Sequence, residues 1–147
     1  MSDCSAPEIA EAYQAVRNDN DDTNWMLITY AEGSNDKVWC LAGKGNDGLD
    51  GLKALLSDSF IGFGYLRVIS GDEMSKRPKF VFIKFVGKQN KLNRKAALNL
   101  QRGDVEKVLS QCNVSLEVDT VDELTEEDVM DRVYKAGGAK YGTASNV

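Results

Sequence analysis

Two pairs of strand-like segments, each joined by a polar turn, constrain the fold of this chain more than any other feature. Residues 25–30 and 38–42 are rich in aromatic and β-branched residues, and so are residues 63–69 and 79–86. Polar, turn-prone segments separate the two members of each pair. Because neighbouring strands joined by a turn run in opposite directions, the sequence predicts antiparallel hairpins at the centre of the fold.

Helices are predicted before and between these hairpins. Ile9, Tyr13 and Val16 lie at i, i+4 and i+7, which indicates an amphipathic helix ending near Arg17, with residues 5–8 as its capping box. Residues 91–100 fit either a short helix or irregular structure. A second helical stripe comprises four leucines, Leu49, Leu52, Leu55 and Leu56.

Three further segments are predicted after Gly103. A helix is indicated by four residues at i, i+3, i+4 and i+7, which are Val105, Val108, Leu109 and Cys112. Residues 114–118 alternate between apolar and polar side chains, as in a short strand. A last helix should run from about residue 121 to 136, where Gly137 and Gly138 are expected to end it.

The resulting order is α-β-β-α-β-β-α-β-α, with helices covering the faces of the sheet. This order is typical of a layered α+β domain and not of a doubly wound one. A chain of 147 residues with 42% hydrophobic residues can build one core of this kind. We expect one domain over residues 1–136 and a flexible C-terminal tail over residues 137–147.

Composition excludes several classes of function. The chain has no histidine, and its three cysteines are widely spaced, so histidine-based nucleophile pairs, zinc sites and a disulfide framework are not expected. No residues combine a nucleophile, a base and an oxyanion site, so we expect no enzyme, no cofactor and no metal. The N-terminus lacks a secretory signal, and no segment approaches the roughly 20 apolar residues of a membrane span.

One motif formally fits a nucleotide-binding loop. Residues 43–48 read G-x-G-x-x-G and lie between a predicted strand and a predicted helix. The strand belongs to a hairpin, however, and residues 60–70 contain no acidic residue at the place expected for a ribose contact. A glycine-rich connection into the helix is therefore the favoured interpretation, and nucleotide binding is the minor alternative.

Charge is strongly divided along the chain. The net charge is −5, but residues 1–60, 61–110 and 111–147 carry −7, +7 and −5. The acidic total argues against general nucleic-acid binding, while the basic middle could bind carboxylates or phosphates of a partner. The same charges are also consistent with a basic turn that is only exposed to solvent and binds no partner. The basic cluster within this middle segment comprises Lys76, Arg77, Lys79, Lys84, Lys88, Lys91, Arg94, Lys95 and Arg102.

Four segments resemble one known family. Asn24-Trp25, residues 63–68, residues 71–83 and the glycine-rich ending 135–141 are similar to the coactosin branch of the actin-depolymerising-factor homology domains. The resemblance runs from the first helix to the tail. It implies a single α+β domain whose mixed sheet of five or six strands is sandwiched between helices.

The resemblance also implies a function. It points to a non-enzymatic protein of the cytoplasm and cytoskeleton that binds the sides of actin filaments without strong severing or depolymerising activity. The basic turn before the fourth strand, here Lys76, Arg77 and Lys79, is the implied filament contact. Three further cations near the long helix are implied to extend this filament contact: Arg94, Lys95 and Arg102. A phosphoinositide-binding or protein-adaptor module using the same cations is the alternative.

The chain departs from the family pattern in places. Pro78 stands where a small hydroxyl residue is usual, and Glu106 stands where relatives often carry lysine. Asp104 could cap the helix that follows it. Lys135 is a candidate contact for another protein partner, although a cation near the end of a helix also compensates the helix dipole.

Overall fold

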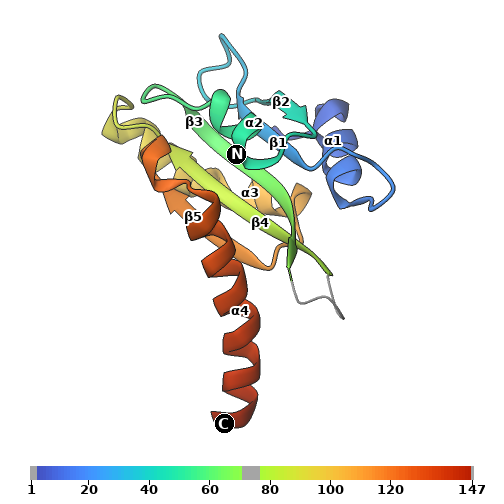
Figure 1. The fold of residues 1–147 in the computed structure, drawn as a ribbon. Helices are drawn as coiled ribbons and strands as arrows, with labels where there is room; N and C mark the ends of the chain where they lie inside the picture. The colour runs from blue at the N-terminus through green and yellow to red at the C-terminus, as the bar shows by residue number, and fades with distance from the viewer. Residues whose placement is uncertain (1–2, 71–76, 147) are drawn as a thin grey trace.

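The protein folds as a five-stranded sheet with two helices on each face (Figure 1). The computed structural model describes residues 3–70 and 77–146, and the side chains of those as far as residue 136. The strands are β1 (Trp25–Tyr30), β2 (Trp39–Gly45), β3 (Ile61–Ser70), β4 (Arg77–Val86) and β5 (Val114–Val118). Their order across the sheet is β2-β1-β3-β4-β5, with β5 parallel to β4 and the other neighbours antiparallel. The mixed α+β sheet is therefore confirmed, with five strands.

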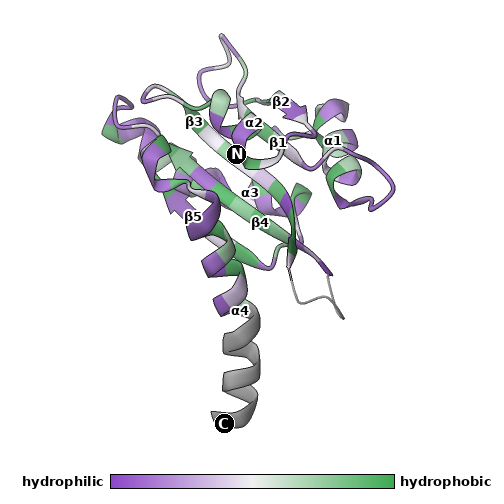
Figure 2. Ribbon diagram, viewed as in Figure 1, coloured by the Kyte–Doolittle hydropathy of each residue, from purple (hydrophilic) through white to green (hydrophobic). Residues whose placement is uncertain are grey.

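Alternating side chains divide the core into two layers. On one face α1 (Pro7–Arg17) and α3 (Leu92–Val108) bury Phe63, Tyr65 and Phe82. On the other face α2 (Gly48–Ala54) and α4 (Glu126–Asn146) bury Leu66, Val81 and related residues. The hydropathy colouring shows β4 as mostly apolar between these layers (Figure 2). This alternation fixes which face of the sheet each functional side chain can reach.

The first helix and both hairpins confirm the prediction, but its capping box is wrong. Ala6 is the N-cap residue of α1 and no side chain caps the helix. The Ser5 hydroxyl instead donates to the Asp3 carboxylate, 2.5 Å away. That carboxylate also accepts the backbone N–H of Ser5, and these hydrogen bonds lower the pKa of Asp3. Ser5 therefore forms hydrogen bonds within the segment that precedes α1 and does not cap the helix.

The long helix α3 corrects two predictions. Residues 91–100 and the segment after Gly103 form one helix, with Gly103 in its interior. The helix ends at Val108, so Cys112 is outside it and exposed. A glycine without a positive φ can occupy a helix at a cost of about 1 kcal/mol relative to alanine, which packing readily outweighs.

The helix boundaries differ at three further points. The segment 121–123 is a short 3₁₀ turn, and α4 begins at Glu126 and continues to Asn146, so Gly137 and Gly138 do not end it. Asp104 lies inside α3, whose N-cap residue is Lys91, so the prediction that Asp104 begins a helix is wrong. The predicted inward stripe of α2 also fails at Leu55, which is 43% exposed just beyond the last helical residue.

Candidate functional site

The basic end of the β3–β4 hairpin presents two cations on one face of the sheet. Arg77 pairs with Ser70 across the hairpin and is exposed, and Lys79 pairs with Val68 and is half-buried. Both lie at the positions of β4 that alternate with Phe80, so they share a face with α4. Within the described residues, neither forms an ion pair. Lys76, the third cation of this predicted site, lies outside the described residues.

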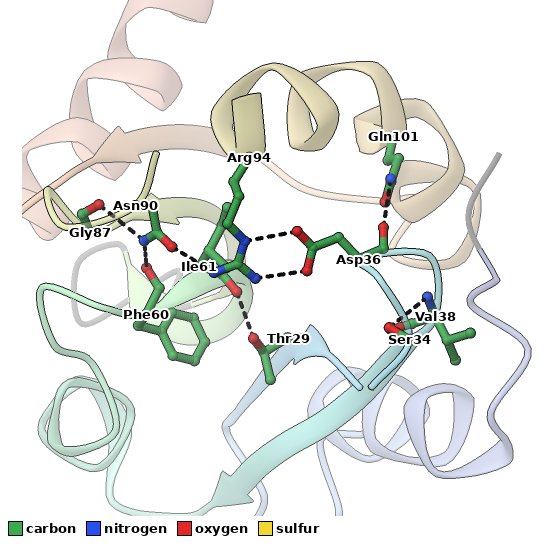
Figure 3. Close-up of polar contacts among 10 residues, drawn as sticks. All are labelled: Thr29, Ser34, Asp36, Val38, Phe60, Ile61, Gly87, Asn90, Arg94 and Gln101. Atoms are coloured by element: carbon green, nitrogen blue, oxygen red, sulfur yellow. Dashed lines mark hydrogen bonds and ion pairs between the residues drawn. The ribbon is translucent and has the colours of Figure 1, made fainter. Parts of the chain in front are cut away.

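Arg94 lies at the start of α3 and fastens the β1–β2 turn to that helix (Figure 3). Its Nε and Nη2 donate to the two oxygens of Asp36 at 2.8 Å each, and its Nη1 donates to Asn90 Oδ1 at 2.9 Å. Gln101 Nε2 donates to the backbone oxygen of Asp36 at 2.9 Å. Asp36 has a φ of 60°, so side chain and backbone contacts hold a turn residue in the left-handed region.

A second ionic network connects α3 with β4 and β5. Glu117 accepts from Lys84 Nζ at 3.2 Å and from Arg102 Nη1 at 3.4 Å. Hydrogen bonding from Lys84 lowers the pKa of Glu117, with a further contribution from Arg102. Arg102 also bonds Glu106 at 3.1 Å and lies over the Phe82 ring, 5.5 Å from its centre. Glu106, the departure from the family pattern, therefore neutralises part of the charge of Arg102.

Lys95 and Lys135 occupy different surroundings. Lys95 is half-buried beside a cavity of about 310 Å³ between α3 and β5, which Lys84, Glu117 and Asp119 also line. Lys135 is 73% exposed on α4 and bonds Asp131 one turn earlier at 3.0 Å. Because α4 continues to Asn146, Lys135 does not lie in its last turn, and the helix-dipole role predicted for it is wrong.

The predicted cations do not gather in one patch. Lys79 lies near one end of β4, while Arg94 contacts residues next to the other end, at Phe60 and Gly87 through Asn90. The seven residue steps from Lys79 to Val86 alone span about 23 Å at the rise of an extended strand. The hairpin cations and Arg94 therefore cannot contact the same side chain of a partner.

The sequence analysis missed an apolar ridge on α3. Leu92 is 80% exposed and Leu100 is 87% exposed, and Ala96 between them is also exposed. Their spacing of four residues places them on one side of the helix. The same spacing is present in the sequence. It indicates an aligned ridge only if residues 91–100 are helical, and the sequence leaves that conformation open. Large exposed apolar side chains that align in this way favour a protein contact.

The described part of the chain holds neither a cluster of metal ligands nor an open glycine-rich loop. Among the described residues, no group of three His, Cys, Asp or Glu side chains is placed to hold a metal ion. The G-x-G-x-x-G segment is filled by the protein itself: Trp25 Nε1 donates to Asp47 at 2.7 Å, and Gly48 N–H donates to Asn24 at 2.9 Å. A Cβ on Gly45 would lie 2.8 Å from Trp25 Nε1, so this glycine serves the packing of tryptophan. None of the described helices combines the length and apolar character of a membrane span.

Comparisons with known proteins agree with this architecture. The family model described as cofilin/tropomyosin-type actin-binding protein matches residues 1–134. Coactosin of Dictyostelium discoideum is 39% identical over 142 residues, which cover 96% of this chain and 95% of that protein. Coactosin of Entamoeba histolytica is 35% identical, covering 99% of this chain and all of that protein. The crystal structure of Entamoeba histolytica coactosin superposes with a TM-score of 0.84, at 28% identity over 93% of this chain and 97% of that one.

Proposed function

The chain belongs to the family of cofilin/tropomyosin-type actin-binding proteins, and from this premise we propose that it binds the sides of actin filaments without strongly severing or depolymerising them. It is a binding protein of the cytoskeleton and not an enzyme. The observation that carries the proposal is its likeness to coactosins over nearly the whole chain. A cytoplasmic location belongs to the same proposal.

The hairpin cations are the proposed centre of the filament contact. Arg77 and Lys79 have no ion pair within the described residues, so their charges are available to acidic groups of actin. Lys76 extends this group by its position in the sequence. The net charge of the chain is −5, so electrostatic attraction to an acidic partner is confined to the basic region. The negative charge elsewhere disfavours nonspecific association.

The helix α3 supplies a second proposed contact. Leu92 and Leu100 provide exposed apolar area, and Lys95 and Arg102 lie beside them on the same helix. Arg102 contributes less charge than a free arginine because Glu106 and Glu117 bond it. Asp36 and Asn90 bind the guanidinium of Arg94. Arg94 therefore contributes to this contact by fixing the shape of the surface and not by direct charge contact.

The proposal is tested by high-speed cosedimentation with preformed actin filaments. The wild type should pellet with filaments. For the double variant Arg77→Ala/Lys79→Ala, the dissociation constant for filaments should be about tenfold higher, which corresponds to a loss of about 1.4 kcal/mol of binding free energy. Lys44→Ala is the control, because Lys44 is an exposed cation on a strand, as Arg77 is, but it lies on β2 at the opposite edge of the sheet. Filament lengths in fluorescence microscopy should stay unchanged at saturation.

Two results would contradict parts of the proposal separately. Wild-type protein that stays in the supernatant at low salt would contradict filament binding. Equal affinities of the hairpin variant and Lys44→Ala, with both folded, would contradict the assigned contact while leaving filament binding intact. Binding to vesicles that contain phosphoinositide, lost in the hairpin variant, would support the alternative use of the same cations.

A further inference from the structure

Among the described strands, β5 lies at an edge of the sheet with β4 as its neighbour (Figure 1). Arg67 N–H donates to Asn24 O beside β1, so the alternate residues Gly64 and Leu66 of β3 direct their backbone groups toward β4. The residues of β4 that do not bond β3, which are Phe80, Phe82 and Lys84, therefore direct theirs toward β5, and the parallel register places the N–H and C=O groups of Val114, Leu116 and Val118 against them. The N–H and C=O groups of Ser115 and Glu117 point away from β4, toward the open edge.

A groove runs between this edge and one side of α4. One part has a volume of about 570 Å³ and is lined by Val114, Asp128, Asp131, Arg132, Lys135 and Ala136. A smaller part of about 90 Å³ reaches Leu116 and Val118 and shares Asp128 and Arg132 with the first. The edge of β5 and this side of α4 therefore form one continuous surface.

The sequence of β5 is complementary to itself. Residues 114–118 read Val-Ser-Leu-Glu-Val, so an antiparallel copy centred on Leu116 places Val114 opposite Val118 and Ser115 opposite Glu117. The outward backbone groups then meet in pairs that exchange both hydrogen bonds, and apolar side chains meet on one face. Glu117 faces a serine of the copy, so no like charges stand opposite each other.

The charges on α4 show a matching symmetry. Asp128, Asp131, Arg132 and Lys135 all line the groove, and their order is acid, acid, base, base. In an antiparallel pair of helices centred between residues 131 and 132, Asp128 faces Lys135 of the copy and Asp131 faces Arg132 of the copy. Every facing pair is therefore of opposite charge. A two-fold axis imposes this reciprocal arrangement.

We propose that this surface binds a second copy of the chain. The two β5 edges pair antiparallel about Leu116, which continues the sheet through both copies, and the two α4 helices lie side by side across the groove. Two features of the chain point to its own copy: the strand is self-complementary about Leu116, and the helix charges are reversed about a point between residues 131 and 132. The interface depends on neither the hairpin cations nor the apolar ridge of α3.

Charge exchange tests the proposal directly. Sedimentation velocity of the wild type between about 1 μM and about 1 mM should show a monomer–dimer equilibrium. Asp131→Arg and Arg132→Asp should each weaken dimerisation at least about tenfold, since each places like charges opposite each other across the axis. The double variant Asp131→Arg/Arg132→Asp should restore it, because the facing pair is again of opposite sign. Circular dichroism checks that these exposed substitutions leave the fold intact.

A backbone test addresses the strand independently. Ser115→Pro removes an N–H that points to the open edge and leaves the ladder with β4, whereas Ser115→Ala removes the hydroxyl and keeps the N–H. Folded Ser115→Pro should therefore dimerise less than Ser115→Ala. A wild type that stays monomeric at every concentration, or a double charge variant no better than the single ones, would overturn the proposal and leave the groove to a different partner.

Discussion

Arg67 joins β3 to the segment between α1 and β1 through three backbone carbonyl groups. Its guanidinium donates to the oxygens of Val16 at 2.8 Å, Asn18 at 2.7 Å and Asp21 at 2.8 Å. The first two carbonyls lie at the C-terminal end of α1, where helix carbonyls lack partners within the helix. A side chain from the centre of the sheet therefore supplies the hydrogen bonds that this helix end needs.

Arg67→Met is expected to lower the free energy of unfolding by about 2–4 kcal/mol, because hydrogen bonds from a charged donor contribute about 1.5–3 kcal/mol each and the carbonyls are only partly solvated afterwards. Urea denaturation measures the change. Lys44→Met, which removes an exposed cation from β2, should stay within about 0.5 kcal/mol of the wild type. A loss no larger than that of the control would show that the three contacts do not hold the segment.

Glu117 predicts a pH dependence of stability. Hydrogen bonding from Lys84, and then Arg102, lowers its pKa in the folded protein. A carboxyl with a lowered pKa stabilises the fold above its unfolded pKa, and this stabilisation is lost as the pH falls through the folded pKa. Glu117→Gln should therefore be less stable at neutral pH, by less than about 1 kcal/mol because the side chain is exposed. The difference should shrink as the pH falls below the ordinary glutamate pKa of about 4.3, and it should vanish below the lowered folded pKa, where both side chains are neutral. A constant difference across this range would contradict the ionic origin.

At the scale of elements, the hairpins are predictable because their cause is local. Aromatic and β-branched runs at residues 25–30 and 79–86 form strands where the sequence indicates them. The end of β2 is less predictable, since it extends through Gly43 and Gly45. A Cβ on Gly43 would lie 2.5 Å from Leu55 Cδ1 and 3.3 Å from the Trp25 ring, so side chains from other elements pack closely over this part of the strand. Such a contact has no signature in the segment itself.

The sequence predicts two separate segments where the structure has one helix, α3, and the cause is again packing that the local sequence does not show. Gly103 resembles a helix end, but in the structure it lies in the helix interior without a positive φ. Leu98 and Val105, on either side of it, are fully buried against the sheet. Their burial decides the conformation across the glycine, and the sequence shows the apolar residues without showing that both face the same layer. Tertiary packing therefore overrides a local stop signal.

Two glycines give a matched test of this account. An added Cβ meets no atom within 4 Å at Gly103 or at Gly48, so neither substitution causes a clash. Gly103→Ala should stabilise the protein by about 0.5–1 kcal/mol, because alanine loses less conformational entropy in a helix. Gly48 has a φ of +65°, and Gly48→Ala should destabilise the protein by about 1 kcal/mol. Thermal unfolding distinguishes these opposite signs, and destabilisation by both would contradict the helical account of Gly103.

At the scale of the molecule, the sequence located the basic region but not its geometry. Five of the predicted cations fall into three separate places: Arg77 and Lys79 at the hairpin end, Lys84 and Arg102 in the ionic network around Glu117, and Arg94 in the clamp on Asp36. Spacing along the chain cannot reveal that Arg94 is held by an acid 58 residues earlier. Only Arg77 and Lys79, at the end of a hairpin, combine a predictable place with charges free of ion pairs among the described residues. These two are the part of the proposed site that sequence analysis alone could define.

The charge division leads to a last prediction about salt. A molecule whose net charge is −5 can approach an acidic filament only through its basic region, and the attraction acts over the Debye length of about 10 Å at 0.1 M salt. Filament affinity should therefore fall with rising salt. Fewer cations make fewer ionic contacts, so the slope of log affinity against log salt should be shallower for Arg77→Ala/Lys79→Ala than for Lys44→Ala. Cosedimentation between about 0.05 M and about 0.3 M salt measures both slopes. Parallel slopes would mean that the hairpin cations do not carry the electrostatic attraction, and would shift it to Lys95 and Arg102 on α3.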